Sequence, residues 1–502
     1  MFSELLREGL QFPESWFQSK LIILFKKGDV KLPKNYRPIA IIPVLSKLFS
    51  GVLLKRLQPL LESLQSEEQN GFRPGYSCND EIHLLRIIAE KAEEWGEEVW
   101  LASLDLEKAF DKVLHSSVFE SLTQAGADPR IINVLRRLYS QQRAYVQIDG
   151  CGKSSCFPIL RGVRQGDPLS PLLFNNVTRL IFNELKDKWQ KLGYGIAIGA
   201  DASANNITHV MFADDTTLIA SSRRQLVSMI KDVKAALAKH GLNLNLGKCE
   251  IQSNNPNGAS GDVDIDGETL PIAHPTKGFK ILGTILTLAG RSSTELKARI
   301  SAAWGKFHKL WPLLGKKDGA LDKRLKLFDM TVTQTALWGS DSWNLTMAEK
   351  RLLKTTFHAM LRRIVSIGRA PEEPWVDWIK RATRKACLEA EKVRIRFWLQ
   401  THISNKFLWA GHVVRMAGTR LARRATEWRD NDWWKLECAT YGHLRQKRPH
   451  RTRWFRWEDD LTRFATHKGW SSWKDEARKR DTEGKARWWQ LHVSEFVAFV
   501  VK

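Results

Sequence analysis

Cysteine is scarce in this chain, with six residues among 502, and most of them stand far apart. Such isolated thiols do not make a disulfide framework, so we expect reduced cysteines in the cytosol or nucleus. Cys438, His443 and His450 come nearest to a zinc-binding spacing, and we interpret them as a fortuitous cluster. Uninterrupted runs of about 18 apolar residues are also absent, and charges interrupt the N-terminus, so we expect neither a membrane span nor a secretory signal.

Positive charge is in excess, and it is unevenly distributed along the chain. The net charge is +24, and residues 351–502 alone hold 34 Lys+Arg against 17 Asp+Glu, together with many of the 21 tryptophans. A strongly basic chain favours a polyanionic partner such as a nucleic acid. Arginines interleaved with aromatics can contact phosphates and stack on unpaired bases, with residues 445–453 as the best candidate. A small helical core with tryptophan anchors and a solvated basic face explains the same composition, and the sequence leaves both interpretations open.

Two adjacent carboxylates, Asp214 and Asp215, stand between short apolar runs in residues 209–220. The pattern predicts a tight β-hairpin with the pair at its tip. Adjoining anions repel each other unless a cation lies between them, and Mg²⁺ suits such a place because it takes hard oxygen ligands and keeps room for phosphates. An Asp-Asp pair by itself is more typical of a surface turn, so the metal hypothesis depends on the rest of the chain.

A further carboxylate, Asp105, ends the nearly continuous apolar run that begins at residue 99. The run predicts a strand buried on both faces, and a helical pattern follows from residue 107 to about Gly126. Asp105 either caps that helix or reaches a metal ion shared with the Asp214 hairpin. We favour the metal role, because Asp111 is available for the structural one.

These segments together resemble the palm of a reverse transcriptase. Residues 105–111 are similar to its first catalytic block (Asp-x4-Phe-Asp), residues 212–215 to its second, and residues 161–171 are nearly a signature of retroelement polymerases. The other matching blocks, in the order of the family, are residues 35–39, 71–77, 241–248 and 279–283. Seven blocks in the right order are very unlikely by chance, and the resemblance spans roughly residues 10–345.

Within that class the chain resembles the polymerase protein of a LINE-type, non-LTR retrotransposon. The features that indicate this group are residues 26–29 (Lys-Lys-Gly-Asp), 337–343 and 361–364, and more loosely 408–416 and 453–460. No agreed chemistry is attached to the last two segments. Proteins of this group usually carry an endonuclease domain before the polymerase, and the residues ahead of Lys26 are too few for one. We therefore expect a fragment, a truncated copy, or a polymerase that relies on a separate nickase.

The resemblance implies an α+β, right-hand polymerase fold, with fingers, a palm containing an antiparallel sheet, and a helical thumb. A basic, Trp-rich, mainly helical C-terminal domain should follow. We expect the fingers in residues 1–98, the palm with the remaining fingers elements in 99–290, the thumb in 291–370 and the C-terminal domain in 371–502. The residue patterns also predict a capped amphipathic helix over 79–98, a hairpin turning near Asp149 and Gly150, and a long helix opened by Pro168 and Pro171.

The resemblance further implies RNA-directed DNA polymerase activity, in which a DNA primer is extended on an RNA template with deoxynucleoside triphosphates. Two Mg²⁺ ions, or Mn²⁺ in their place, would serve the reaction. Asp105 and Asp214 are the expected primary ligands, with the carbonyl of Leu106 as another. Neighbouring side chains on a strand point to opposite faces, so Asp215 is expected to assist from the turn or to bind less directly.

The remaining site residues are expected at the nucleotide by the same resemblance. Arg73 would contact the triphosphate, and Phe110 would pack under the sugar and exclude a 2′-hydroxyl. Gln165 would face the nucleotide, Gly166 would permit close backbone approach, and Lys248 would protonate the departing pyrophosphate. Core filling is the alternative for Phe110, and a solvated surface position is the alternative for Lys248.

Three rival functions share these motifs. A non-enzymatic, nucleic-acid-binding relic would keep the fold without turnover, although the intact Asp105, Asp214 and Asp215 argue against it. A group II intron-type maturase would show itself by specific intron RNA binding, and an RNA-dependent RNA polymerase by the use of ribonucleotides. In each case we expect a nuclear or cytoplasmic ribonucleoprotein that has no contact with a membrane.

Overall fold

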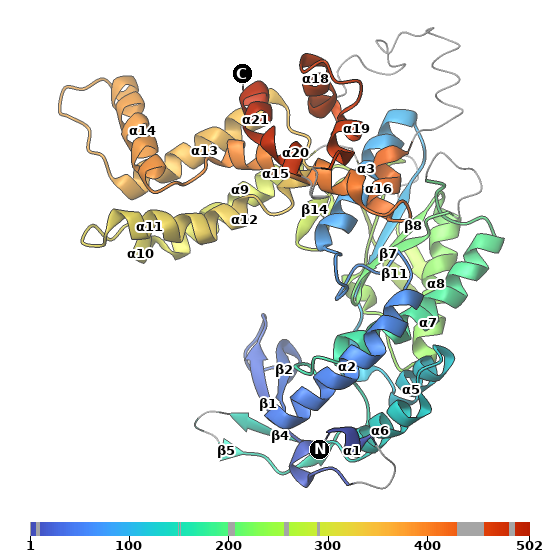
Figure 1. The fold of residues 1–502 in the computed structure, drawn as a ribbon. Helices are drawn as coiled ribbons and strands as arrows, with labels where there is room; N and C mark the ends of the chain where they lie inside the picture. The colour runs from blue at the N-terminus through green and yellow to red at the C-terminus, as the bar shows by residue number, and fades with distance from the viewer. Residues whose placement is uncertain are drawn as a thin grey trace, which may run out of the picture.

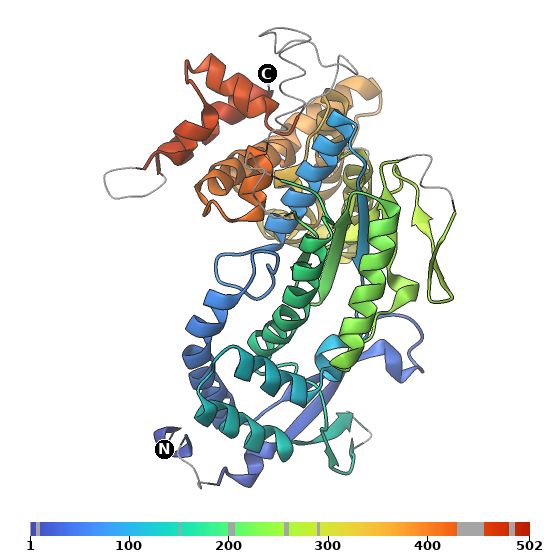
Figure 2. The same cartoon turned by 90° about the vertical axis from the view of Figure 1, so that its right-hand side faces the viewer.

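The computed structural model describes residues 2–6, 11–148, 150, 152–198, 206–255, 261–288, 292–428, 456–480 and 487–501. The N-terminal strands lie at one end of the molecule and the thumb and C-terminal helices at the other, with a sheet between them (Figures 1 and 2). The predictions for Asp149, for residues 445–453 and for the Cys438, His443 and His450 cluster lie outside the described residues.

The central sheet is built around β3 (Trp100–Leu104), in the strand order β12-β9-β3-β8-β7. Its other members are β7 (His209–Phe212), β8 (Asp215–Ala220), β9 (Glu250–Ser253) and β12 (Ile272–Ala273). β3 runs antiparallel to both β8 and β9. Trp100 and Leu104 enter one hydrophobic core and Leu101 enters another, so both faces of β3 are covered. This explains its continuous apolar sequence, as expected.

Five helices surround the first of these cores. They are α2 (Val44–Leu64), α5 (His115–Gln124), α6 (Pro129–Ser140), α7 (Ser170–Lys191) and α8 (Arg223–Lys239). The predicted helix after Pro168 is present as α7, with a proline in its first turn. The predicted helix over 107–126 is wrong in one respect, because it breaks into α4 (Ala109–Lys112) and α5. At the break, the carbonyl of Val113 accepts from Gly162 and the N–H of Leu114 donates to His240, so distant segments replace the helical bonds.

A second sheet forms the fingers end of the molecule (Figure 1). Its strands are β1 (Gln18–Phe25), β2 (Tyr36–Ile41), β4 (Arg143–Ile148), β5 (Gly152–Lys153) and β6 (Phe157–Pro158). β1 is antiparallel to β2 and parallel to β4, and β4 pairs antiparallel with β5. The hairpin predicted near Gly150 is therefore present, and it joins the fingers sheet.

Helix α3 (Cys78–Trp95) lies behind the central sheet. Ser77 and Asp80 form a capping box at its start, so the helix begins slightly earlier than predicted. One side of α3 contacts β7, and another contacts α16 (Leu421–Glu427) of the C-terminal region. Its role thus extends beyond the fingers and palm, because it is also the support on which the C-terminal helices pack.

The thumb helices share a core that extends past the expected boundary at residue 371. The core joins α9 (Ser293–Lys309), α11 (Leu321–Phe328), α13 (Met347–Val365) and α14 (Trp375–Lys392), and its last member is Trp398. Ala386 and Ala390 of α14 are buried in it. The Pro-Glu-Glu-Pro segment at 371–374 is therefore a turn between two helices of one core. The change of core falls at the start of α15 (Trp398–Arg415) instead.

The C-terminal helices share a core with α3. They are α15, α16, α18 (Asp459–His467), α19 (Trp473–Arg478), α20 (Arg487–Leu491) and α21 (Val493–Val501). Trp428, Trp457, Trp473 and Trp489 are buried in this core, whereas Trp488 is partly exposed. The buried tryptophans favour the helical-core interpretation of this composition. Across the described residues, we find no helix with the length and apolar character that a membrane span requires.

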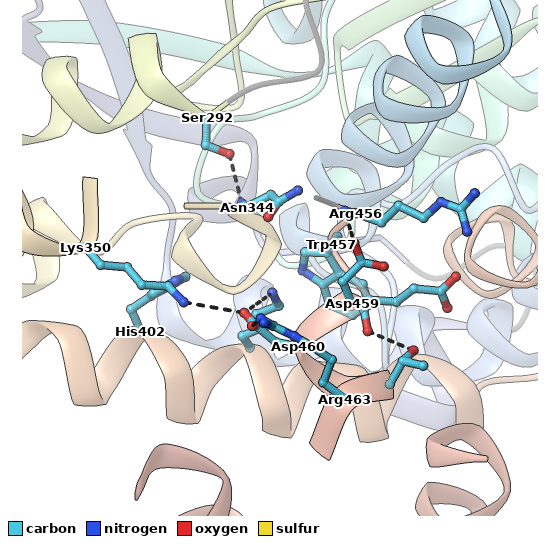
Figure 3. A network of polar contacts seen from close by, with 12 residues as sticks. Ser292, Asn344, Lys350, His402, Arg456, Trp457, Asp459, Asp460 and Arg463 are labelled. Atoms are coloured by element: carbon cyan, nitrogen blue, oxygen red, sulfur yellow. Dashed lines mark hydrogen bonds and ion pairs between the residues drawn. The ribbon is translucent and has the colours of Figure 1, made fainter. Parts of the chain in front are cut away.

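A polar network joins the thumb, α3 and the C-terminal helices (Figure 3). Asp460 lies 3.7 Å from Lys350 of α13 and 3.3 Å from Lys406 of α15, and it also pairs with Arg463 at 2.6 Å. Three residues earlier in the chain, the N–H of Trp457 donates to Glu90 of α3 at 2.8 Å. The segment around residue 460 thus fastens three parts of the chain to one another.

Candidate active site between the fingers and the palm

A cavity of about 890 Å³ lies between the fingers sheet and the palm. Asp105, Asp214, Phe110, Gln165 and Lys248 all line it, so the structure brings together most of the predicted site residues. Seven basic residues line the same cavity, namely Lys26, Lys27, Arg37, Lys108, Lys112, Arg164 and Lys248. A cavity of this size and charge can hold a polyanionic small molecule.

Asp214 is presented by the turn of the β7–β8 hairpin, as the sequence predicted. Phe212 pairs with Asp215, and Ala213 between them has a φ of 61°. The side chain of Gln69 holds this turn on both sides, because it accepts from the N–H of Ala213 at 2.9 Å and donates to its carbonyl at 3.2 Å. A β-carbon at Gly71 would stand 2.1 Å from the Ala213 nitrogen, so only glycine permits this approach.

The three aspartates lie close enough to repel one another. Burial and the charge of Asp105 raise the pKa of Asp214, against the lowering effect of Arg37 and Lys26. Burial, followed by the charges of Asp214 and Asp105, raises the pKa of Asp215 to about 6. Strand pairing explains why Asp105 lies close to the hairpin aspartates. Leu104 pairs with Thr216, and the next residues in that antiparallel register are Asp105 and Asp215. Such a cluster is costly without a cation nearby.

Lys248 supplies part of that missing positive charge. Its Nζ lies 2.9 Å from Oδ2 of Asp105, and both side chains are partly exposed. Lys248 is expected at the departing pyrophosphate. In this structure its ammonium instead forms an ion pair with Asp105. The backbone of Asp105 is fixed as well, because its carbonyl accepts from Asn245 at 2.8 Å.

The oxygen atoms that Asp105, Asp214 and Leu106 offer at the cavity fit a hard cation. In the described part of the chain, no three His, Cys, Asp or Glu side chains make a complete metal site. Asp105, Leu106 and Asp214 all line the cavity, however. Carboxylate and carbonyl oxygens are the ligands that Mg²⁺ prefers, with the remaining positions left to water and substrate phosphates. Asp215 is more exposed than Asp214 and does not line the cavity.

Phe110 has a rigid support. Its ring stacks on Phe174 with centroids 4.6 Å apart, and Phe72 meets it edge-on at 6.0 Å. The side chain is partly buried in the core and also faces the cavity. The packed ring of Phe110 thus forms part of the cavity wall.

Gln165 and Gly166 are both constrained by their neighbours. Nε2 of Gln165 donates to Asp111 at 3.1 Å, and the Gln165 carbonyl accepts from Ala40 at 2.8 Å. Gly166 has a φ of 119°, and a β-carbon there would stand 2.5 Å from the Ala40 carbonyl oxygen. The close approach that requires glycine is thus made by strand β2.

The prediction for Arg73 needs correction. Its Nε lies 2.8 Å from Glu62, and Nη1 donates to the carbonyls of Ser66 at 2.6 Å and Gln69 at 2.9 Å. The side chain is 5% exposed and is not part of the cavity lining. A buried guanidinium needs partners of this kind, and the nearby carboxylate of α2 supplies them.

Two residues near the aspartates were not anticipated. Gln69 fixes the hairpin turn, and a single amide in a loop gives no sequence signal for that role. Glu81 of α3 is 1% exposed and accepts a long hydrogen bond from Thr217 at 3.4 Å. Burial and then the charge of Asp215 raise its pKa to about 8. Its partner Thr217 lies on β8, more than a hundred residues along the chain, so no pattern in the sequence indicated this contact.

The chain matches the family described as "Reverse transcriptase (RNA-dependent DNA polymerase)" over residues 25–286, just over half of its length. The protein therefore belongs to the reverse transcriptase family, and the described architecture is its right-hand polymerase fold. Members of this family generally use divalent metal ions. The match covers the residues that line the cavity and the whole palm sheet, and it begins at the last residue of β1.

Within the family, its relatives are proteins of non-LTR retrotransposons, which confirms the narrower resemblance. The chain is 30% identical over 238 residues to "Retrovirus-related Pol polyprotein from type-2 retrotransposable element R2DM" of Drosophila melanogaster, covering 47% of this chain and 21% of that protein. It is 26% identical to "RNA-directed DNA polymerase from mobile element jockey" of Drosophila funebris, covering 66% of this chain and 36% of that protein. The chain thus spans about a fifth to two fifths of the length of such relatives. Among solved structures, it is similar to apo telomerase from Candida tropicalis, with a TM-score of 0.43, 14% identity, and coverage of 83% of this chain and 70% of that one.

Proposed function

We propose that the chain is an RNA-directed DNA polymerase of a non-LTR retrotransposon. It would extend a DNA primer on an RNA template, with deoxynucleoside triphosphates as substrates and the DNA target as the source of the primer. The observation that carries this proposal is the meeting of Asp105 and Asp214 at one basic cavity, although they lie more than a hundred residues apart. Family membership independently supports the same chemistry.

Two Mg²⁺ ions are the proposed cofactor, with Mn²⁺ as a substitute. Asp105, Asp214 and the carbonyl of Leu106 are the proposed donors, and Asp215 supports them from the turn. Ions held there would activate the primer hydroxyl and neutralise charge on the triphosphate. The mutual repulsion of the aspartates favours this, because a group of carboxylates in a partly buried place gains most from a nearby cation.

The basic residues around the cavity have a role in binding. Lys26, Lys27 and Arg37 would attract the triphosphate and the template backbone. Lys248 would leave Asp105 once that carboxylate has another cation, and its ammonium would then donate a proton to the departing pyrophosphate. Its partly exposed side chain leaves it room to move.

The rest of the cavity would select and orient the nucleotide. Phe110, backed by Phe174, would exclude a 2′-hydroxyl, and Gln165, held by Asp111, would face the nucleotide beside Gly166. Arg73 is proposed here to shape the loop that carries Phe72, in place of a direct contact with the triphosphate. As domains, we assign the fingers to 1–98, the palm with further fingers elements to 99–290 and the thumb to 291–398.

Primer extension on an RNA template tests the proposal. Purified protein with Mg²⁺ and deoxynucleotides should lengthen the primer, and the Asp105→Asn and Asp214→Asn variants should not. Asp322→Asn is a matched control, because this exposed thumb aspartate only pairs with Lys326 at 3.7 Å. Binding of primer–template without extension by the wild-type chain would support the relic instead. Extension with ribonucleotides alone would support an RNA polymerase.

A further inference from the structure

The segment from residue 67 to residue 77, here called the 67–77 loop, is fixed at its beginning to the hairpin that presents Asp214. The N–H of Met211 donates to Glu68 and the N–H of Asn70 donates to Met211, each at 2.7 Å. Gln69 between them holds Ala213 through its side chain. The start of the loop therefore moves only if the hairpin moves.

The middle of the loop carries Phe72 into the cavity. Its ring is 56% exposed, lines the cavity and meets Phe110 edge-on. Phe72 has a φ of 58°, a left-handed conformation that costs energy for a residue with a large side chain. Such a conformation persists only where the surrounding structure fixes it.

The C-terminal region holds both ends of the loop. Oγ1 of Thr419 donates to Glu67 at 2.9 Å, and Nη1 of Arg420 donates to the Gly75 carbonyl at 3.2 Å. Nη2 of Arg420 also forms a short ion pair with Asp80. These two residues stand immediately before α16, some 340 residues along the chain from their partners. We call them the 419–420 clamp.

Tyr76 is the point on which the clamp closes. The guanidinium carbon of Arg420 lies 3.4 Å from the centre of its ring, and that of Arg73 lies 4.0 Å from it. Two guanidinium groups cannot occupy one face at such distances, so they must cover opposite faces of the ring. Planar arginine stacks well in this way, and lysine does not. The Tyr76 hydroxyl also donates to Glu67 at 2.8 Å, the carboxylate that Thr419 contacts.

We infer that Thr419 and Arg420 are positioning residues for nucleotide addition, because they hold the 67–77 loop so that Phe72 stands at the wall of the nucleotide cavity. This inference rests on the proposed polymerase function. It makes the C-terminal region a support of the polymerase site, although none of the residues described in that region lines the cavity.

The clamp can be separated from the folding of α3. Asp80 uses Oδ2 for the capping box with Ser77 and Oδ1 for Arg420. Loss of the arginine therefore leaves the start of α3 capped, while the 67–77 loop loses its stacked and charged support. Arg424 of α16 is a matched control, because it donates to the Ile198 carbonyl at 2.9 Å, away from the 67–77 loop. Its replacement removes the same charge from a position only one helical turn away.

Steady-state incorporation of a single deoxynucleotide tests the inference on the full chain. Arg420→Ala should raise KM for the nucleotide about tenfold and change kcat by less than about twofold, because the loop shapes the binding wall and not the reacting atoms. Arg420→Lys keeps the charge but not the stacking, so it should recover part of the loss. Arg424→Ala should behave as wild type. An unchanged KM in Arg420→Ala, or an equal rise in Arg424→Ala, overturns the inference.

Hydrogen exchange gives a readout that does not depend on activity. The amides of residues 67–77 should exchange faster in Arg420→Ala than in wild type, whereas those of α7 should not. Unchanged exchange in the loop overturns the positioning role. A further outcome is a wild-type chain that extends no primer while Arg420→Ala still shows faster exchange in the loop. That result overturns the proposed polymerase function and leaves the clamp in place.

Discussion

Two groups of carboxylates, one among the thumb and C-terminal helices and one at the cavity, have different surroundings. Asp460, in the network of Figure 3, has Lys406, Lys350 and Arg463 as partners. Burial alone would raise its pKa, but these three cations outweigh burial and the pKa is lowered. The charge of this carboxylate is thus neutralised by the protein itself.

The aspartates of the cavity show the opposite balance. Burial and mutual repulsion raise the pKa of Asp214 and of Asp215, and the lysine at Asp105 is partly exposed. A carboxylate with three internal cations is a structural connection. A carboxylate cluster with too few neighbouring cations is stabilised when an external cation binds to it. The difference separates the part of the molecule that holds the domains together from the part that performs chemistry.

The sharpest way to break this comparison is to neutralise one aspartate of each kind. Asp214→Asn should lower the rate of nucleotide incorporation by about a thousandfold or more, because a primary metal ligand is lost. It should leave the free energy of unfolding unchanged or slightly higher, since a repelled charge is removed. Pre-steady-state incorporation and urea unfolding measure the two quantities.

Asp460→Asn should do the reverse. It leaves Lys350 and Lys406 buried without their anion, and breaking such a group costs about 3–5 kcal/mol of stability. The folded fraction should retain the incorporation rate of wild type, because this network lies away from the cavity. Equal losses of stability in both variants would show that the two sites are of one kind.

Local structure and the principal aspartates followed from the sequence because their signals are local. The apolar run of β3, the hairpin at Asp214 and the helix after Pro168 depend on neighbours within a few residues. Motif spacing then placed Asp105 and Asp214 together. Pro371 and Pro374 gave a true turn, but the helices on both sides of it share one core, because a proline marks where a helix begins and does not show which core it joins.

Long-range partners did not follow from the sequence. An arginine such as Arg73 can serve a phosphate or a carboxylate, and only the fold shows that Glu62 is the nearer partner. The break after α4 depends on hydrogen bonds to Gly162 and His240, and the stacking of Arg420 on Tyr76 spans most of the chain. Such contacts leave no pattern of spacing in the sequence.

Divalent ions offer a smaller and more direct comparison. Mg²⁺ at about ten times its dissociation constant should stabilise the wild-type protein by about 1.4 kcal/mol, without substrate. Asp105→Asn should lose this gain, and Asp460→Asn should keep it. Lys248→Met should bind the ion more tightly, because a competing cation leaves Asp105. Thermal unfolding with and without Mg²⁺ provides the measurement, and stabilisation that survives Asp105→Asn would contradict the site.

The pH dependence of stability should have opposite signs at the two sites. The pKa of Asp215 rises from 3.8 to about 6 on folding, so between these values the folded state binds more protons than the unfolded state. Stability must then fall as pH rises through this window, and Asp215→Asn should remove that part of the slope. Because this side chain is exposed, solvent screening limits the effect to about 1 kcal/mol. The lowered pKa of Asp460 instead gives stability that is lost as pH falls below about 4. Saturating Mg²⁺ should reduce the pH slope due to Asp215 and leave the one due to Asp460, because only the cavity carboxylates gain a cation. A slope at Asp215 that Mg²⁺ does not change would contradict the distinction between the two sites.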